Sequence, residues 1–523
     1  LQPSFRRFGT CHRTADPVAD RRQFVDETVG RRAGTHADDF SFDDRDEGVA
    51  AATVITPLMI HGLQLSGYGL WLLVVSVVGY CGLLDLGITF SASRFVAMEV
   101  GAGRVQREAL VLEVAARHFR RMAWIILALC PLVVWLTGHW VADSDSWYVE
   151  MALAILLGAM VLRFMCRKSL VVLRGVLRHD LIAMASIIRG IVQFSLMCWV
   201  LRSSSSIIWV AVVQAGGEAL EQAWLHYFAS GFLKKAGQAA TSTDEMRQTS
   251  RKMHIFAAHI SLIMIGEAMR FQTGPLIVHF HSGLEAVPLF SVGLRLLTML
   301  QDIVGAVFGG TVLSVFSQLH GAGDEKQLRT SFFRYSELAA GFSSCAVLGS
   351  VWLAPAFFER WVGHELAAAS DLMLSAALPY ALHFAQFPAH NLMYSLNRAM
   401  PLAKLSLYGG AASAILGFIL GAWWGVHGVV AGLAIEMLVS RMIVVPVLVS
   451  RVMGVSVGVY LLRYLGWPAL KVLLPPACCA LVLRPWLAAD YGRLALLGSA
   501  FLAVSALSFF FHFLKKEERL MIY

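Results

Sequence analysis

The chain has 523 residues, of which 57% are hydrophobic and only 15% are charged, and its formal net charge is +8. Soluble domains carry about a quarter of charged residues, so this composition excludes an ordinary soluble protein. The positive charge is divided among short loops between long apolar runs, which is typical of a polytopic membrane protein and gives no support to nucleic-acid binding.

Residues 1–46 differ from the rest of the chain, because they are rich in Arg and Asp and poor in apolar residues. They contain no apolar h-region of a secretory signal peptide. We expect a disordered tail, or one that results from a misassigned start, and we attach no function to it.

Fourteen apolar segments follow, and all but the first are long enough to cross a bilayer as helices of about twenty residues. The first is short and contains Pro57 and His61, so it is either a truncated span or a tilted stub. The segments are 48–62, 67–91, 122–141, 149–173, 181–201, 207–229, 255–280, 287–316, 335–357, 371–395, 402–423, 427–449, 466–484 and 492–513.

The loops between these segments alternate in charge. One set is rich in Lys and Arg, for example at 104–121 and 234–252, whereas the opposite set is short and poor in positive charge. The positive-inside rule places the basic loops and both termini in the cytoplasm. We therefore expect a multi-pass protein of a bacterial cytoplasmic (inner) membrane.

Several features recur at an offset of 220 residues. Gly101 and Gly321 follow long apolar segments, Arg178 and Arg398 precede helices, and Gly190 and Gly410 lie within those helices. The offset predicts two homologous halves in a parallel repeat, because each half holds an even number of spans. The expected divisions are a first six-helix lobe at 47–232, an inter-lobe cytoplasmic loop at 233–253, a second six-helix lobe at 254–450, and two extra helices with a basic tail at 451–523.

Short motifs in the second segment add a family resemblance. The stretches Tyr68-Gly69-Leu70-Trp71, Leu83-Leu84-Asp85-Leu86-Gly87 and Ser93-Arg94-Phe95-Val96-Ala97 resemble the second helix of bacterial polysaccharide-biosynthesis transporters. The stretch from Ile265 to Gly323 resembles the seventh and eighth helices of the same family. These proteins are the oligosaccharide flippases of the multidrug/oligosaccharidyl-lipid/polysaccharide (MOP) exporter superfamily.

The resemblance covers residues 50–514 and implies an all-α fold with two lobes around a central cavity. It implies that the chain flips a polyprenyl-pyrophosphate-linked oligosaccharide from the inner to the outer leaflet by alternating access. Membrane lipid, and a polysaccharide polymerase with its export machinery, are the partners that such a role involves. The short first helix departs from the family pattern.

Ionisable residues inside apolar segments are candidates for function, because each costs roughly 2.5–3.5 kcal/mol at a helix centre. Glu267, Arg270 and Asp302 are expected at a similar depth near mid-bilayer, with Arg295 about two turns further out. We predict a ring in which Arg270 and Arg295 attract a pyrophosphate and Glu267 or Asp302 balances them. The alternative is an internal ion pair that ties the seventh and eighth helices together and never meets substrate.

Further candidates are weaker. Asp85 and Arg94 match the family motif, although Arg94 also fits an anchor that extends to the cytoplasmic interface. Glu218 and Glu436 are candidate proton or cation sites, or buried hydrogen-bonding groups. Arg189 is a further cavity candidate because it lies in the middle of its segment.

Other functions remain as alternatives. A cation-coupled multidrug exporter of the same superfamily is disfavoured by intramembrane Arg, and a peptidoglycan lipid-precursor flippase also has fourteen spans. A membrane enzyme is not expected, since the outer loops are short and no nucleophile elbow or phosphate-binding loop is present. The eight Cys residues form no CxxC pair, so we expect no metal or cofactor.

Overall fold

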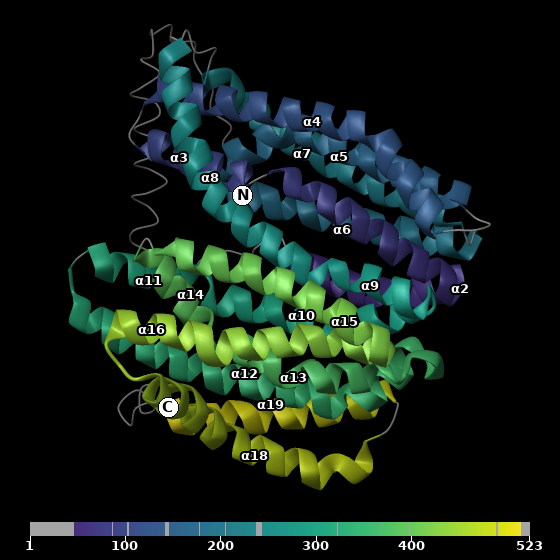
Figure 1. Ribbon diagram of the computed structural model, residues 1–523, viewed down its shortest axis with the longest axis vertical. Coiled ribbons are helices and arrows are strands. Elements are labelled where there is room, and N and C mark those ends of the chain that lie inside the picture. The colour runs from purple at the N-terminus through teal and green to yellow at the C-terminus, as the bar shows by residue number, and fades with distance from the viewer. Residues whose placement is uncertain are drawn as a thin grey trace, which may run out of the picture.

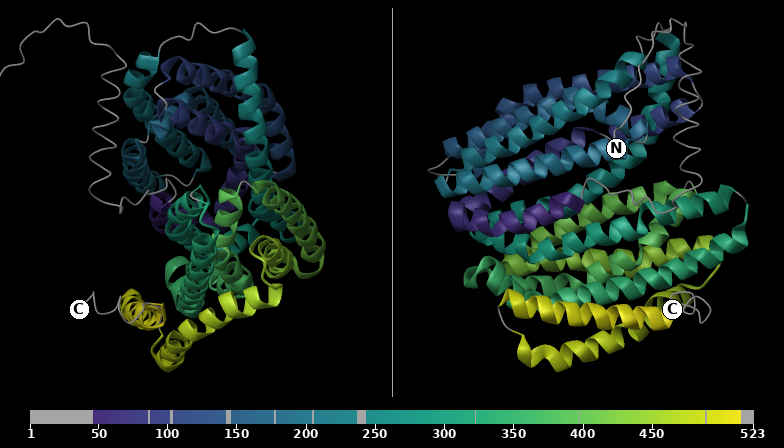
Figure 2. Two further views of the ribbon diagram at one scale, coloured as in Figure 1. Left: turned by 90° about the vertical axis from the view of Figure 1, so that its left-hand side faces the viewer. Right: turned by 180° about the vertical axis from the view of Figure 1, so that it is seen from behind.

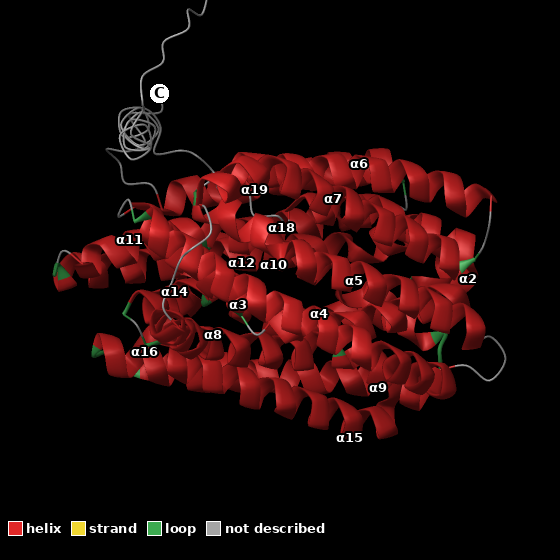
Figure 3. Ribbon diagram, turned by 90° about the horizontal axis from the view of Figure 1, so that it is seen from above, coloured by secondary structure: helices red, strands yellow, loops and turns green. Residues whose placement is uncertain are grey.

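The computed structural model describes residues 46–513 apart from 86, 102–103, 142–145, 177, 204–205, 237–242, 322, 397 and 488–489. The expected N-terminal tail up to residue 45 and the basic C-terminal tail from 514 lie outside the described residues. Throughout the described part, the regular structure is helical, as Figure 3 shows. Long apolar stretches become helices because the backbone in lipid has to satisfy its own hydrogen bonds.

The helices of the first half of the chain are the following: α2 (Asp46–Gly82), η1 (Leu83–Asp85), α3 (Ile88–Gly101), α4 (Val105–Val141), α5 (Ser146–Gly175), α6 (His179–Ser203) and α7 (Ile207–Ala236). The second half has α8 (Thr243–Phe271), α9 (Thr273–Ser282), α10 (Ala286–Phe308), α11 (Gly310–Gly321), α12 (Glu325–Val362), η2 (His364–Leu366), α13 (Ala369–Ala385), α14 (Phe387–Ser395), α15 (Ala399–Val439), η3 (Ser440–Val444) and α16 (Val445–Met453). The C-terminal part has α17 (Val457–Val459), η4 (Tyr460–Gly466), α18 (Trp467–Leu483), η5 (Arg484–Trp486) and α19 (Tyr491–Phe513).

Helix α2 contains a chain reversal at Gln64, which has φ 60° and ψ 173°. The side chains of Thr56 and Tyr68 hydrogen-bond to each other across this reversal. In a straight helix these two residues would be about 18 Å apart, so the contact requires two antiparallel helices. The first apolar segment is therefore a short crossing helix that ends at the reversal.

A second reversal divides α15 at Gly425, which has φ 55°. Such a positive φ is strained for residues with a Cβ, so glycine suits this turn. A Cβ added at Gly428 would meet the backbone of Leu420, and one at Gly432 would meet the backbone of Gly417. The halves of α15 thus lie side by side, as the eleventh and twelfth crossings.

Nine helical stretches of the described chain are each long and apolar enough to cross a membrane. Two of these, Ile55–Asp85 and Ala399–Met453, contain the reversals just described. The remaining crossings are made by α7 or by pairs of helices that meet at a break, such as α8 with α9 and α13 with α14. Breaks in crossing helices are tolerated where the freed backbone groups find partners inside the protein.

The 220-residue repeat is visible in the backbone. The amide of Arg104 donates to Glu99 O, and the amide of Asp324 donates to Leu319 O, with both positions shifted by 220. The same shift relates the bond from Arg178 N to Leu173 O with the bond from Arg398 N to Met393 O. The structure confirms the predicted fold, an all-α bundle of two six-helix lobes followed by two C-terminal helices.

Figure 1 shows the two lobes stacked along the long axis of the molecule, with α8 running obliquely from the first lobe into the second. Helices α18 and α19 pack on α12 at the end remote from the first lobe, which both views of Figure 2 show. The α7 helix ends at Ala236 and α8 begins at Thr243, within the expected inter-lobe loop. The exact domain boundaries stay a prediction.

Candidate functional site

A cavity of about 530 Å³ lies where the first lobe meets α10 of the second lobe. Both arms of α2, together with α6 and α7, supply its first-lobe wall, and Ser291, Val292 and Arg295 of α10 supply the opposite wall. The reversal at Gln64 places the two arms of α2 side by side in this wall. The volume falls within the range of small-molecule binding sites, about 300–1,000 Å³.

The first-lobe wall carries a chain of hydrogen-bonded polar side chains. Arg189 donates to Glu221 at 2.6 Å and to Gln193 Oε1 at 3.3 Å, and the Gln193 amide donates to Gln214 Oε1. Gly217 lies against Gln193 and Arg189, where its missing Cβ leaves room for them. All four linked side chains line the cavity. Arg189 is thus a half-buried cation that already has one carboxylate partner.

Arg295 is the cation of the opposite wall. It is half-buried, lies near Tyr68, and has no ion pair with the described carboxylates. It lies nine positions after Ala286, the first residue of α10, and so about 14 Å from that helix end. Arg189 lies ten positions after His179, the first residue of α6, and so about 15 Å from that helix end. Both cations are therefore well inside the membrane-spanning region.

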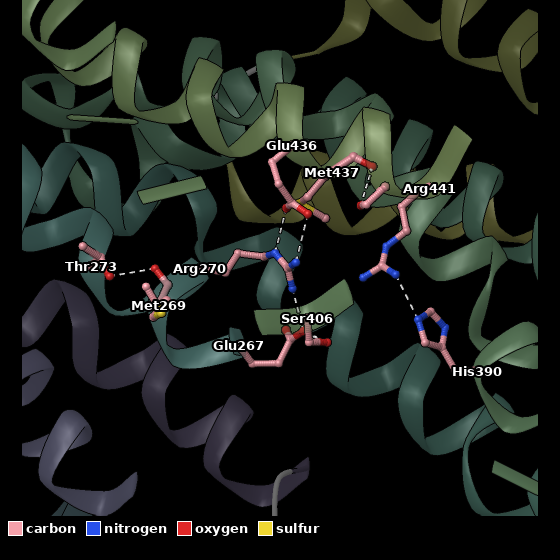
Figure 4. Close-up of polar contacts among 10 residues, drawn as sticks. Glu267, Met269, Arg270, Thr273, His390, Ser406, Glu436, Met437 and Arg441 are labelled. Carbon is pink, nitrogen blue, oxygen red and sulfur yellow. Dashed lines mark hydrogen bonds and ion pairs between the residues drawn. The ribbon is translucent and has the colours of Figure 1, made fainter. Parts of the chain in front are cut away.

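A second polar region lies inside the second lobe, away from this cavity. Arg270 on α8 donates to Glu267 at 2.6 Å and to both carboxylate oxygens of Glu436 on α15 at 2.9 and 3.1 Å. Figure 4 shows the guanidinium of Arg270 between these two carboxylates. The Arg270 side chain is 1% exposed and that of Glu436 is 4% exposed. This triad is an ion-pair network in which Arg270 and Glu436 are buried and Glu267 is half-buried.

Local sequence explains how the triad forms. A Cβ at Gly266 would collide with the backbone of Ser406, and one at Gly410 would collide with the backbone of Gly266. The two glycines let α8 and α15 approach at backbone contact, one turn from Arg270. Beside the triad, buried Arg441 donates to His390 Nε2 at 2.9 Å from the π-helical turn η3. π-Helical turns are rare in proteins, and those that occur are often found at functional sites.

The structure therefore separates the predicted ring. Arg295 lines the cavity, whereas Arg270, Glu267 and Asp302 are not among the lining residues. The ion pair of Arg270 ties α8 to α15, rather than the seventh to the eighth crossing as the alternative had it. A substrate-binding role for Arg270 stays a prediction, with no cavity contact to support it. Asp302 is half-buried two turns along α10 from Arg295.

The other candidates lie in the first lobe. Asp85 is buried and accepts from Thr89 at 2.6 Å, and Arg167 donates to the same hydroxyl at 3.1 Å. Glu218 pairs with Arg163 at 2.5 Å. Arg94 is exposed, and its guanidinium lies 4.4 Å from the ring centre of Phe256 on α8. None of Asp85, Glu218 and Arg94 lines the cavity.

Glu221 and the two glutamines are cavity residues that sequence reasoning missed. Gln214 and Glu221 are seven residues apart on α7, so they lie on one face of that helix, two turns apart. A polar face on an otherwise apolar segment is the sequence pattern that could have identified these residues. Among the described residues, no group of three or more His, Cys, Asp and Glu side chains is placed to hold a metal ion.

No protein-family model matches the chain, and no curated protein matches it by sequence. Solved structures do match. The lipid II flippase MurJ, in an inward closed conformation, aligns with a TM-score of 0.67 at 13% identity, over 92% of this chain and 98% of that one. An inward-facing multidrug resistance MATE transporter of the MOP superfamily aligns with a TM-score of 0.63 at 13% identity, over 77% of this chain and 92% of that one.

A third match is a MOP superfamily transporter from Pyrococcus furiosus, whose structure was described as having a binding pocket of reversed polarity. It aligns with a TM-score of 0.53 at 13% identity, over 80% of this chain and 98% of that one. At these identities the matches establish the fold. The chain is a multi-pass membrane protein with the fold of MOP superfamily transporters, and the matched structures are those of transporters and a flippase.

Proposed function

We propose that the protein flips a polyprenyl-pyrophosphate-linked oligosaccharide across the bacterial cytoplasmic membrane, for the assembly of a surface polysaccharide. The observation that carries this proposal is the cavity between the lobes, where Arg295 has no carboxylate partner among the described residues. A half-buried cation that faces a cavity inside the membrane, with no carboxylate partner in the described part of the chain, points to an anionic ligand, because an uncompensated charge is costly there. Arginine suits phosphate because its planar guanidinium donates two hydrogen bonds at once.

The uncharged lining supports a ligand that carries a sugar. Gln193, Gln214, Ser186 and Ser291 offer amide and hydroxyl groups, and Trp71 adds an aromatic surface. Amide and hydroxyl groups can form hydrogen bonds with the hydroxyls of a sugar. An aromatic ring such as that of Trp71 offers a large apolar contact surface with a polar edge. A purely apolar drug would form no hydrogen bonds with these amide and hydroxyl groups.

The extent of the structural matches supports a lipid substrate over a drug. The MurJ match covers 92% of this chain, whereas the MATE match covers 77%. MurJ is named as a flippase of lipid II, itself a lipid-linked precursor, so flipping of the peptidoglycan precursor is the second candidate. Export of multidrug cations fits the cavity less well, because its lining has one more cation than anions.

In this proposal the lobes rock so that the cavity opens to one leaflet at a time. The basic loops and both termini lie in the cytoplasm, and the oligosaccharide leaves on the other side, where a polymerase and export machinery receive it. Coupling to an ion gradient is part of the proposal. The sequence predicted ion coupling or charge balance for Glu218, Glu436, Glu267, Asp302 and Asp85. Glu218 and Glu436 pair with arginines outside the cavity lining, so this proposal gives them no coupling role.

Deletion of the gene tests the proposal in its host. We expect loss of one surface or exported polysaccharide and accumulation of its lipid-linked repeat unit inside the cell, with complementation by the intact gene. Complementation by a variant with Arg295→Gln should fail although that protein reaches the membrane. Normal polysaccharide combined with new sensitivity to cationic drugs would replace the proposal with multidrug export.

A further inference from the structure

The charged lining of the cavity consists of Arg189, Arg295 and Glu221 within the described chain, which gives one net positive charge. A lipid joined to a sugar through a pyrophosphate contains two esterified phosphates, each with about one negative charge. The cavity as it stands would therefore hold this ligand with one uncompensated negative charge. In a site of low dielectric constant such an imbalance is expensive.

Glu221 is the group that leaves the cavity with one positive charge fewer than the ligand has negative charges. It binds Arg189 at 2.6 Å, so Arg189 is already neutralised before any ligand enters. If Glu221 takes up one proton, the carboxyl becomes neutral and Arg189 is released. The cavity then presents two cations from opposite walls, Arg189 of the first lobe and Arg295 of the second, which match two phosphates.

On this basis we propose that Glu221 is the proton-coupling residue of the flippase: it is protonated when the pyrophosphate binds, and Arg189 moves from Glu221 to the ligand. The proton comes from water that enters the cavity and returns to water when the ligand leaves and Arg189 rejoins the carboxylate. One proton is bound for each pyrophosphate. This proposal rests on the proposed function.

The surroundings of Glu221 favour it over the other acidic candidates. Glu221 is bound to Arg189 from α6, it also interacts electrostatically with Arg167 from α5, and α10 contributes Arg295 to the same cavity. From α2 the titratable group in the lining is Tyr68, and α4, which also packs on α7, contributes no residue to it. Glu218, one turn away on α7, is bound to Arg163 outside the lining. It is therefore a matched control.

The proposal also predicts ligand discrimination. A lipid joined to a sugar through a single phosphate carries about one negative charge, which the cavity balances without a proton. Binding of the monophosphate should therefore not take up a proton. Binding of the pyrophosphate should become tighter as the pH falls, by up to about tenfold per pH unit, because one proton is bound with it.

The test is equilibrium binding of two short-chain probes to the full chain in lipid nanodiscs between pH 6 and pH 8. The probes are farnesyl diphosphate-linked and farnesyl phosphate-linked N-acetylglucosamine, and proton uptake is followed with a dye in weakly buffered solution. We expect the wild type and Glu218→Gln to take up one proton with the diphosphate probe only. Glu221→Gln should bind that probe with at least tenfold higher affinity at pH 8, independently of pH and without proton uptake.

Three results would overturn the inference. Diphosphate binding by the wild type without proton uptake would refute it and leave the proposed function standing. Unchanged proton uptake in Glu221→Gln would assign the proton to another group. Failure of both probes to bind the folded wild type would refute the proposed function itself, and the inference with it.

Discussion

Two arginines on neighbouring crossings of the second lobe have opposite environments. Arg270 is 1% exposed on its side chain and is held by two carboxylates, whereas Arg295 faces a cavity and has no carboxylate partner among the described residues. Arg270 contributes to architecture, because each of its three guanidinium nitrogens already donates to a carboxylate and its charge is neutralised. A cation that faces an open volume is available to a ligand. The number of charges in a membrane segment is therefore less informative than whether each already has a partner.

Loss of Arg270 should have the largest effect on stability. Arg270→Ala leaves Glu436 buried without a counter-ion, and removal of one partner of such a pair costs about 3–5 kcal/mol of unfolding free energy. We expect a lowered melting temperature of the purified protein in detergent and little folded protein in the membrane. The double variant Arg270→Met with Glu436→Met removes both charges and should recover much of the loss. If Arg270→Ala were fully stable but inactive, Arg270 would belong to the substrate site.

Loss of Arg295 should affect transport and leave stability unchanged. Charge-assisted hydrogen bonds contribute about 1.5–3 kcal/mol, so Arg295→Gln should weaken binding of a lipid pyrophosphate about 10- to 100-fold. Arg295→Lys keeps the positive charge but lacks the planar guanidinium. Its affinity for the lipid pyrophosphate should therefore lie between those of the wild type and Arg295→Gln. Binding titration beside a melting curve separates the two effects. Unchanged affinity in Arg295→Gln would remove this residue from the site.

The close contact of α8 with α15 gives a third comparison. A Cβ at Gly266 meets the backbone of Ser406, so Gly266→Ala should destabilise the second lobe by about 1–3 kcal/mol. A Cβ at Gly158 on α5 meets nothing within 4 Å, and Gly158→Ala is the matched control with an unchanged or slightly higher melting temperature. Equal melting temperatures for the two variants would contradict the packing described for α8 and α15.

Arg94 should show the smallest effect. Its exposed guanidinium interacts with the ring of Phe256, a contact that contributes about 0.5–1 kcal/mol at such a site. Arg94→Ala should therefore fold normally and retain most of its flipping activity in a reconstituted assay. Abolished activity with normal folding would instead support the sequence prediction that Arg94 contacts substrate.

The architecture was accessible from the sequence, because hydropathy, loop charge and a repeat are properties of the chain itself. The apolar runs 48–62 and 67–91 were separated correctly, and the turn between them is the reversal at Gln64. The offset of 220 residues predicted the repeat that the hydrogen bonds of Arg178 and Arg398 display.

The site was only partly accessible. Depth along a helix can be counted from the sequence, and it placed Arg295 and Arg189 well inside the membrane. The direction in which a side chain points around its helix depends on packing, so Arg270 was grouped with Arg295 although it faces Glu436 on α15. That partner lies 166 residues further along the chain, and only the fold brings the two together.

The central claim is that the cavity arginines bind the pyrophosphate of a lipid-linked sugar while the triad of Arg270 supports the fold. Flipping of a fluorescent short-chain prenyl-diphosphate oligosaccharide in proteoliposomes tests it most directly, with Arg295→Gln compared against the double variant Arg270→Met with Glu436→Met. We predict rapid flipping by the wild type, measurable flipping by the double variant and flipping slowed at least tenfold by Arg295→Gln. Flipping by Arg295→Gln at the wild-type rate, or no flipping by the wild type, would contradict the account.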